Sequence, residues 1–253
     1  MFIETTGSGP DLVLIHGWAM HGGIFAPLVA RLSHQFRVHC VDLPGHGRSR
    51  DVPIAQLQAV ECASAIAEQT PPAIWIGWSL GGLIAQQGAL DHPDHVRGLV
   101  AIAASPCFIA NSHWPHGVDA HVNAQFAENL GRDFHNTVDR FLALETMGSP
   151  NPQAELRELK HIAFAHGEPM PEALIAGLRV LRETDLRERL GALACDSLWI
   201  SGRRDRLIPP AAMAWSAQRC DGELLALNAG HAPFLSDTDA VASAIAAFAG
   251  PIT

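Results

Sequence analysis

The stretch AIWIGWSLGGLIAQQGALD, residues 73–91, decides the fold. Its beginning is continuously apolar, as a strand buried on both faces of a parallel sheet should be. Its remainder, Leu80–Asp91, has the pattern of a helix, and the single residue Ser79 separates the two. A strand-to-helix turn this tight strains its central residue and needs small neighbours such as Gly77 and Gly81. A Gly-x-Ser-x-Gly match alone arises by chance in roughly one chain in ten of this length, but this setting makes Ser79 a candidate nucleophile.

Other apolar runs recur along the chain between turn residues, at Leu12–Ile15, Val38–Val41, Leu99–Ala103, Ser197–Ser201 and Glu223–Leu227. Between them lie helical patterns at Ile24–Leu32, Gln56–Gln69 and Ala240–Phe248. Strands that alternate with helices predict a doubly wound α/β fold with a mostly parallel sheet.

One segment breaks this alternation, because residues 111–186 show only helical patterns. We therefore expect a core domain in two parts, residues 1–110 and 187–253, with an all-helical insertion between them. Such an insertion would lie over the carboxyl ends of the strands, where open α/β sheets bind ligands. We interpret it as a lid.

A serine hydroxyl is a poor nucleophile unless a base removes its proton. Of the 14 histidines, His231 is best placed, because it follows the last apolar run and precedes the C-terminal helical pattern. Asp205 follows the preceding run and would fix the tautomer of His231 and stabilise its imidazolium form. The chain order Ser79, Asp205, His231 is the order found when the nucleophile lies on a strand-to-helix elbow. These three residues are the predicted catalytic triad.

The oxyanion of an ester-cleaving reaction needs backbone N–H donors. One donor should be Leu80, the residue after the candidate nucleophile. The second should be Trp18, in the turn after the first long apolar run, where Gly17 permits a close backbone approach. The Trp18 indole would then form a wall of the pocket. An ordinary buried tryptophan is the alternative.

Composition excludes several other classes of function. Hydrophobic residues make up 48% of the 253 residues and charged residues 17%, as in globular proteins. The net charge of −9 argues against nucleic-acid binding, which needs a basic surface. The five cysteines are scattered without zinc-ligand spacing, so we expect free thiols, a reducing cytoplasmic location and no metal. The N-terminal segment lacks a signal-like apolar region, and no membrane association is expected.

The motifs LIHGW, VDLPGHGRS, GWSLGG, GRRDRLIP and GHAPF together resemble the α/β-hydrolase superfamily along nearly the whole chain. More narrowly, HGW paired with GWSLGG, together with AASPCF, HWP, TVDRFLALETMG and GHAPF, is similar to the pimeloyl-acyl-carrier-protein methyl ester esterases of biotin synthesis. The second resemblance is the more specific, because it includes motifs of the expected lid, which diverges fastest.

This resemblance implies hydrolysis of the methyl ester of a pimeloyl chain on an acyl carrier protein, and the mechanism would pass through an acyl-Ser79 intermediate. We expect a monomer that needs no cofactor. The substrate contacts that it implies are Trp18, Ser79, Leu80, Phe141, Leu142, Ala143, Leu144, Glu145 and His231.

Lid arginines of the family face the acidic carrier, and here Arg140, Arg157 and Lys160 are the candidates. Helical spacing would place Arg132 and Arg140 on nearly the same face, and Arg157 with Lys160 at i, i+3. A solvated face of mixed charge is the alternative.

Two further functions stay open. A general short-chain carboxylesterase would show no preference for a carrier-bound ester over a free one. A ligand receptor on this fold would turn over its ligand at most once or very slowly.

Overall fold

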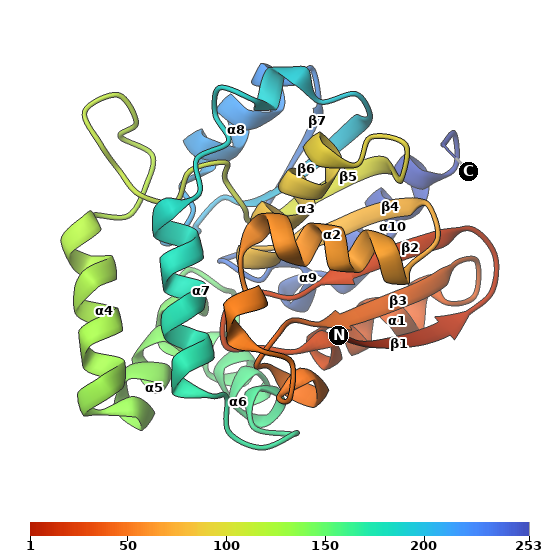
Figure 1. Cartoon of the computed structure of the whole chain (residues 1–253). Coiled ribbons are helices and arrows are strands. Elements are labelled where there is room, and N and C mark those ends of the chain that lie inside the picture. The colour runs from red at the N-terminus through yellow and green to blue at the C-terminus, as the bar shows by residue number, and fades with distance from the viewer. Residues whose placement is uncertain (253) are drawn as a thin grey trace.

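The computed structural model describes residues 1–252. A seven-stranded sheet forms its centre in the order β1-β3-β2-β4-β5-β6-β7, and only β1 runs antiparallel to its neighbour (Figure 1). The strands are β1 (Phe2–Gly7), β2 (Asp11–Ile15), β3 (Arg37–Asp42), β4 (Ala73–Trp78), β5 (Val96–Ile102), β6 (Asp196–Gly202) and β7 (Glu223–Leu227).

Helices cover both faces of the sheet. One face carries α2 (Ala59–Gln69) and α3 (Leu80–Asp91), and the other carries α1 (Ala26–Leu32), α9 (Pro233–Ser236) and α10 (Thr238–Ala249) (Figure 1). Helix α8 (Pro210–Arg219) packs against β6 and β7. Strand β4 and most of α3 are buried, which explains their continuously apolar sequence. No helix within residues 1–252 is both long and apolar enough to cross a membrane.

Four helices lie between β5 and β6 along the chain, and we call them the inserted helices. They are α4 (Ala120–Arg132), α5 (Phe134–Glu145), α6 (Pro152–Ala163) and α7 (Pro171–Glu183), and they gather at one end of the sheet (Figure 1). The expectation of purely helical structure from residue 111 is wrong at its start, because bridges join Ile109 to Val118 and Asn111 to Trp114 in a loop that precedes α4. The division into a core domain and a lid stays a prediction.

Strand β1 was not among the predicted strands. It is an edge strand whose side chains are mostly exposed, so it has no apolar run to reveal it. The other six strands coincide with the predicted runs to within a few residues. The mostly parallel, doubly wound sheet is confirmed.

Candidate active site

Ser79 occupies the turn between β4 and α3 with a backbone conformation that is rare for a side-chain-bearing residue, φ 54° and ψ −117°. Its N–H donates to the Ile102 carbonyl at the end of β5, at 3.0 Å. The next residue, Leu80, is the first of α3. The sheet and the helix together therefore hold Ser79 at the carboxyl end of β4.

The structure brings the three predicted triad residues together in one hydrogen-bonded chain. The His231 Nε2 atom lies 2.9 Å from the Ser79 hydroxyl oxygen, and His231 Nδ1 lies 2.8 Å from Asp205 Oδ2. The other carboxylate oxygen of Asp205 accepts from the N–H groups of Leu207 and Ile208, at 2.8 and 3.0 Å. Because a carboxylate only accepts, Nδ1 carries the proton and Nε2 is left to accept from the serine.

Two contacts hold the loop that carries His231. The indole N–H of Trp78 donates to the His231 carbonyl at 2.8 Å, from the strand that precedes Ser79. The His231 N–H donates to the Glu145 carbonyl at 3.3 Å, at the end of α5. The position of the histidine therefore depends on both the sheet and the inserted helices.

The two predicted oxyanion donors are the backbone N–H groups of Trp18 and Leu80. Among the described residues, no acceptor lies within hydrogen-bond reach of the Trp18 or Leu80 backbone N–H. The Trp18 side chain is fully buried, its indole N–H donates to the Leu174 carbonyl of α7 at 2.8 Å, and its ring lies 4.3 Å from the Phe141 ring of α5. The indole thus joins the core to the inserted helices, and its place as a wall of the pocket stays a prediction.

His16 fixes the turn that carries Trp18, a role that the sequence alone did not suggest. Its Nδ1–H donates to the Gly17 carbonyl at 2.7 Å, and its Nε2 accepts from the Leu43 N–H at 3.0 Å. Burial lowers the pKa of His16 to about 3, with a further contribution from nearby His46. A neutral His16 can therefore keep both bonds at physiological pH.

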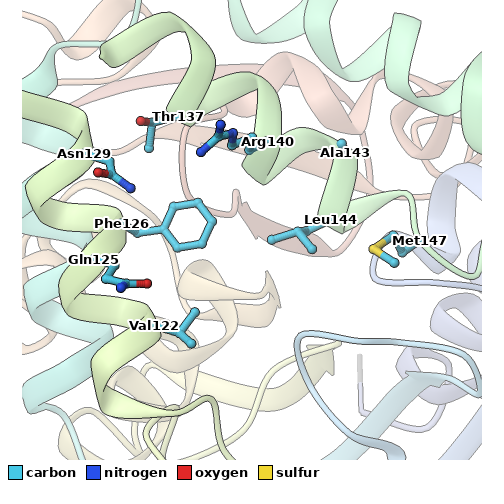
Figure 2. A pocket seen from close by; sticks show the side chains of 9 residues that line it. All are labelled: Val122, Gln125, Phe126, Asn129, Thr137, Arg140, Ala143, Leu144 and Met147. Carbon is cyan, nitrogen blue, oxygen red and sulfur yellow. The ribbon is translucent and has the colours of Figure 1, made fainter. Parts of the chain in front are cut away.

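Two hollows lie among the inserted helices. An outer groove of about 470 Å³ separates α4 from α5, and Figure 2 shows Phe126 projecting across it towards Leu144. Its lining consists of Val122, Gln125, Phe126, Asn129, Thr137, Arg140, Ala143, Leu144 and Met147. An inner cavity of about 40 Å³ lies behind it and shares Val122, Phe126 and Leu144 with the groove. The other residues of the inner cavity are Phe108, Val118, Asn123, Phe141, Leu178 and Leu207.

The implied substrate contacts on α5 divide into two groups. Phe141, Ala143 and Leu144 line the groove or the cavity, whereas Leu142 and Glu145 are fully buried and line neither. Neither carboxylate oxygen of Glu145 has a hydrogen-bond partner among residues 1–252. Burial raises the pKa of Glu145 well above its usual range, and the charge of Asp205 raises it further.

The candidate docking residues also differ from one another. Arg140 and Arg157 are exposed and form no ion pair with another described residue, whereas Lys160 lies 2.9 Å from Asp139. The expectation that Arg132 shares a face with Arg140 is wrong, because a break at Asp133 places them on different helices. Arg132 instead pairs with a glutamate on its own helix α4.

Comparison with known proteins agrees with this fold. The model of the alpha/beta hydrolase family matches residues 12–244. Among solved structures, an esterase from Exiguobacterium antarcticum superposes with a TM-score of 0.89 at 23% identity, covering 98% of this chain and 94% of its own. An enol-lactonase from Burkholderia xenovorans superposes with a TM-score of 0.86 at 20% identity, covering 98% and 95%. Fold and site thus define an α/β hydrolase, and the predicted fold class is confirmed.

Relatives in sequence identify a more specific group within this family. The pimeloyl-[acyl-carrier protein] methyl ester esterase of Stenotrophomonas maltophilia is 52% identical over 250 residues, which cover 98% of this chain and 96% of that protein. The protein of the same name from Xanthomonas oryzae pv. oryzae is 50% identical over 256 residues and the full length of both. The chain therefore belongs to the pimeloyl-[acyl-carrier protein] methyl ester esterases within the alpha/beta hydrolase family, and it is an ester-hydrolysing enzyme.

Proposed function

We propose that this enzyme hydrolyses the methyl ester of a pimeloyl group carried on an acyl carrier protein, releasing methanol and a free carboxylate for biotin synthesis. The observation that carries the ester chemistry is the continuous hydrogen-bonded chain from Ser79 through His231 to Asp205. The carrier and the pimeloyl chain are supported by the names of relatives that match the inserted helices as well as the sheet.

In the first half-reaction the Ser79 oxygen attacks the ester carbonyl carbon while His231 Nε2 takes the serine proton. The carbonyl oxygen becomes negative and accepts from the backbone N–H groups of Trp18 and Leu80. When this tetrahedral intermediate collapses, the C–O bond to the methoxy group breaks and His231 returns its proton to form methanol. The acyl group is left on Ser79.

In the second half-reaction His231 removes a proton from water, and the resulting hydroxide attacks the acyl carbonyl carbon. The bond to the Ser79 oxygen breaks and that oxygen regains a proton from His231, which frees the carboxylate. Asp205 keeps its charge throughout and stabilises the imidazolium that forms in each half-reaction. These steps require no cofactor or metal.

The inserted helices serve in this proposal as a lid over the triad, and the enzyme acts as a cytoplasmic monomer. The acyl chain enters between α4 and α5, where Phe141, Ala143 and Leu144 supply wall atoms. Arg140 lines the outer groove and Arg157 forms no ion pair with any residue that the structure describes, so these two are better placed than Lys160 to meet an acidic carrier.

Replacement of Ser79 by alanine tests the proposal. We expect Ser79→Ala to lower hydrolysis of the carrier-bound ester by about 10⁴-fold or more, and Asp205→Asn to cost a similar factor. Ser216→Ala is the matched control, because Ser216 is buried in α8 and its hydroxyl donates to the Ala212 carbonyl of the same helix. Methanol release should be measured by mass spectrometry with a carrier-bound ester and with a free short ester.

The outcomes separate the alternatives. Equal efficiency on carrier-bound and free esters would identify a general carboxylesterase, whereas a single slow turnover with binding would identify a receptor. More than about one per cent residual activity in Ser79→Ala would rule out Ser79 as the nucleophile. The wild-type gene, but not the Ser79→Ala gene, should restore biotin-independent growth to a strain that lacks such an esterase.

A further inference from the structure

The side-chain amide nitrogen of Asn123 is buried without a hydrogen-bond partner in the part of the chain that the structure describes. Asn123 lies on α4 and is 4% exposed. Every other residue that lines the inner cavity is apolar. A buried amide that makes no hydrogen bond destabilises a fold, so native structures rarely contain one without a reason.

The inner cavity adjoins the candidate active site on two sides. Phe141, one of its walls, packs against the Trp18 ring at 4.3 Å between centroids. Leu207, another wall, donates its N–H to Asp205. The cavity thus lies next to both the oxyanion turn and the acid loop.

The inner cavity also borders the outer groove. Phe126 and Leu144 line both hollows, and Arg140 lines the groove beyond them (Figure 2). In the proposed function the acyl chain runs from this groove to Ser79, and on that path it would pass the cavity. A methylene chain suits the apolar walls, but Asn123 offers a hydrogen bond that a methylene chain cannot use.

We propose that the Asn123 amide binds the second carbonyl group of a dicarboxylic acyl chain, and that it thereby selects esters that have a carbonyl at their far end over plain fatty esters. This proposal rests on the proposed function, in which the far carbonyl is the thioester of the carrier-bound pimeloyl group. A substrate without that carbonyl would bury the amide unpaired, which is how a polar group in an apolar site discriminates. Asn123 is a specificity residue in this proposal and takes no part in bond breaking.

The test compares two free esters of similar length, dimethyl pimelate and methyl octanoate, with Asn123→Leu. Wild-type kcat/KM should favour dimethyl pimelate by more than the factor of two expected from its two equivalent ester groups. In Asn123→Leu, kcat/KM for dimethyl pimelate should fall roughly tenfold, the size of one lost neutral hydrogen bond. The value for methyl octanoate should stay the same or rise. Gln86→Met is the matched control and should leave the ratio unchanged, because Gln86 is a buried amide on α3 that also lacks a side-chain partner among the described residues but lines neither hollow.

Thermal unfolding distinguishes a specificity role from a structural one. Leucine has the same branched outline as asparagine and removes the unpaired amide, so Asn123→Leu should keep or raise Tm. Equal losses on both esters with a lowered Tm would overturn the proposal, because the amide would then support the fold through a bound water. An unchanged diester-to-monoester ratio would overturn it as well. Both probes are free esters, so a failure of the carrier preference would contradict the proposed function without altering this ratio.

Discussion

The side chain of Glu145 conflicts in its chemistry with its surroundings. It ends α5, it is fully buried, and neither of its carboxylate oxygens has a partner among residues 1–252. Its backbone carbonyl accepts a hydrogen bond from the His231 N–H. Glu145 therefore cannot move away without displacing His231, the candidate base. Burial raises its pKa well above the usual range, so the side chain stays neutral in the folded protein at pH values where the unfolded chain ionises it.

This difference predicts how Glu145→Gln changes stability with pH. Because the pKa of Glu145 is raised in the folded protein, its carboxyl is protonated in both states below the unfolded pKa of about 4.3. In that range the buried carboxyl costs the wild type no stability through ionisation. As pH rises, its stability falls relative to the variant by about 1.4 kcal/mol per pH unit, until the folded pKa is reached. Urea unfolding at several pH values between 4 and 9 measures the difference. A difference independent of pH would show that Glu145 ionises freely in the folded protein.

Helix α3 begins in closer contact with the sheet than a side chain would allow. A Cβ atom on Gly81 would lie 2.1 Å from the Ile15 carbonyl oxygen and 2.5 Å from the His16 carbonyl oxygen. Gly81→Ala should therefore displace the start of α3 and with it the Leu80 N–H. We expect a loss of about 1–3 kcal/mol in the free energy of unfolding and a clear loss of esterase activity.

Gly131→Ala is the control for that change. Gly131 lies in the last turn of α4, and a Cβ atom there would have no neighbour within 4 Å. The same substitution should stabilise the protein by about 0.5–1 kcal/mol, because alanine favours the helix more than glycine. Both variants can be compared by chemical denaturation. A Gly81→Ala protein as stable as Gly131→Ala would contradict the close approach of α3 to β2.

Differences in burial between elements explain which parts of the fold could be predicted from the sequence alone. The strand and helix that flank Ser79 were predicted to the residue, because burial on both faces leaves an uninterrupted apolar run. The triad residues follow such runs, so their order and approximate place could also be inferred. The break between α4 and α5 could not, because no proline marks Asp133 and the apolar spacing continues across it.

The sequence pattern also could not predict the side-chain contacts that depend on how two helices face each other. Periodicity shows that α4 has an apolar face, but not that its Asn123 would lie in a cavity closed by Phe141 and Leu207. Nor does it show that Lys160 would be paired with Asp139 while Arg157 forms no ion pair within the described part of the chain. These contacts join residues far apart in the chain, and only the packed structure sets them.

At the scale of the whole molecule, the net charge of the enzyme disfavours its encounter with an acyl carrier protein. The enzyme carries a net charge of −9, and an acyl carrier protein is expected to be acidic as well. Long-range attraction is therefore absent. Docking must depend on charges within about one Debye length, roughly 8 Å at physiological salt, of the carrier surface.

Reversal of Arg140 and Arg157 to glutamate tests this local attraction. Both side chains are exposed and form no ion pair within residues 1–252, so their charges are available to a carrier. The double variant should raise KM for the carrier-bound ester by roughly tenfold at low salt, since each surface contact is worth about 1 kcal/mol or less. The increase should shrink as salt is added, because added ions screen the exposed charges. Turnover of a free short ester should change little, since neither arginine belongs to the triad or to the oxyanion turn.

Reversal of Arg179 and Arg182 on α7 provides the matched control, because it changes the net charge equally. Those arginines already pair with Glu183, so they offer less free charge to a partner. If both double variants raised KM for the carrier-bound ester alike, overall repulsion would govern the encounter and the site near Arg140 would have no special role. If the Arg140 and Arg157 variant lost activity equally on both esters, the two arginines would support the packing of the inserted helices. A selective rise in KM, confined to the carrier-bound ester and to low salt, is the result that places the carrier at the mouth of the outer groove.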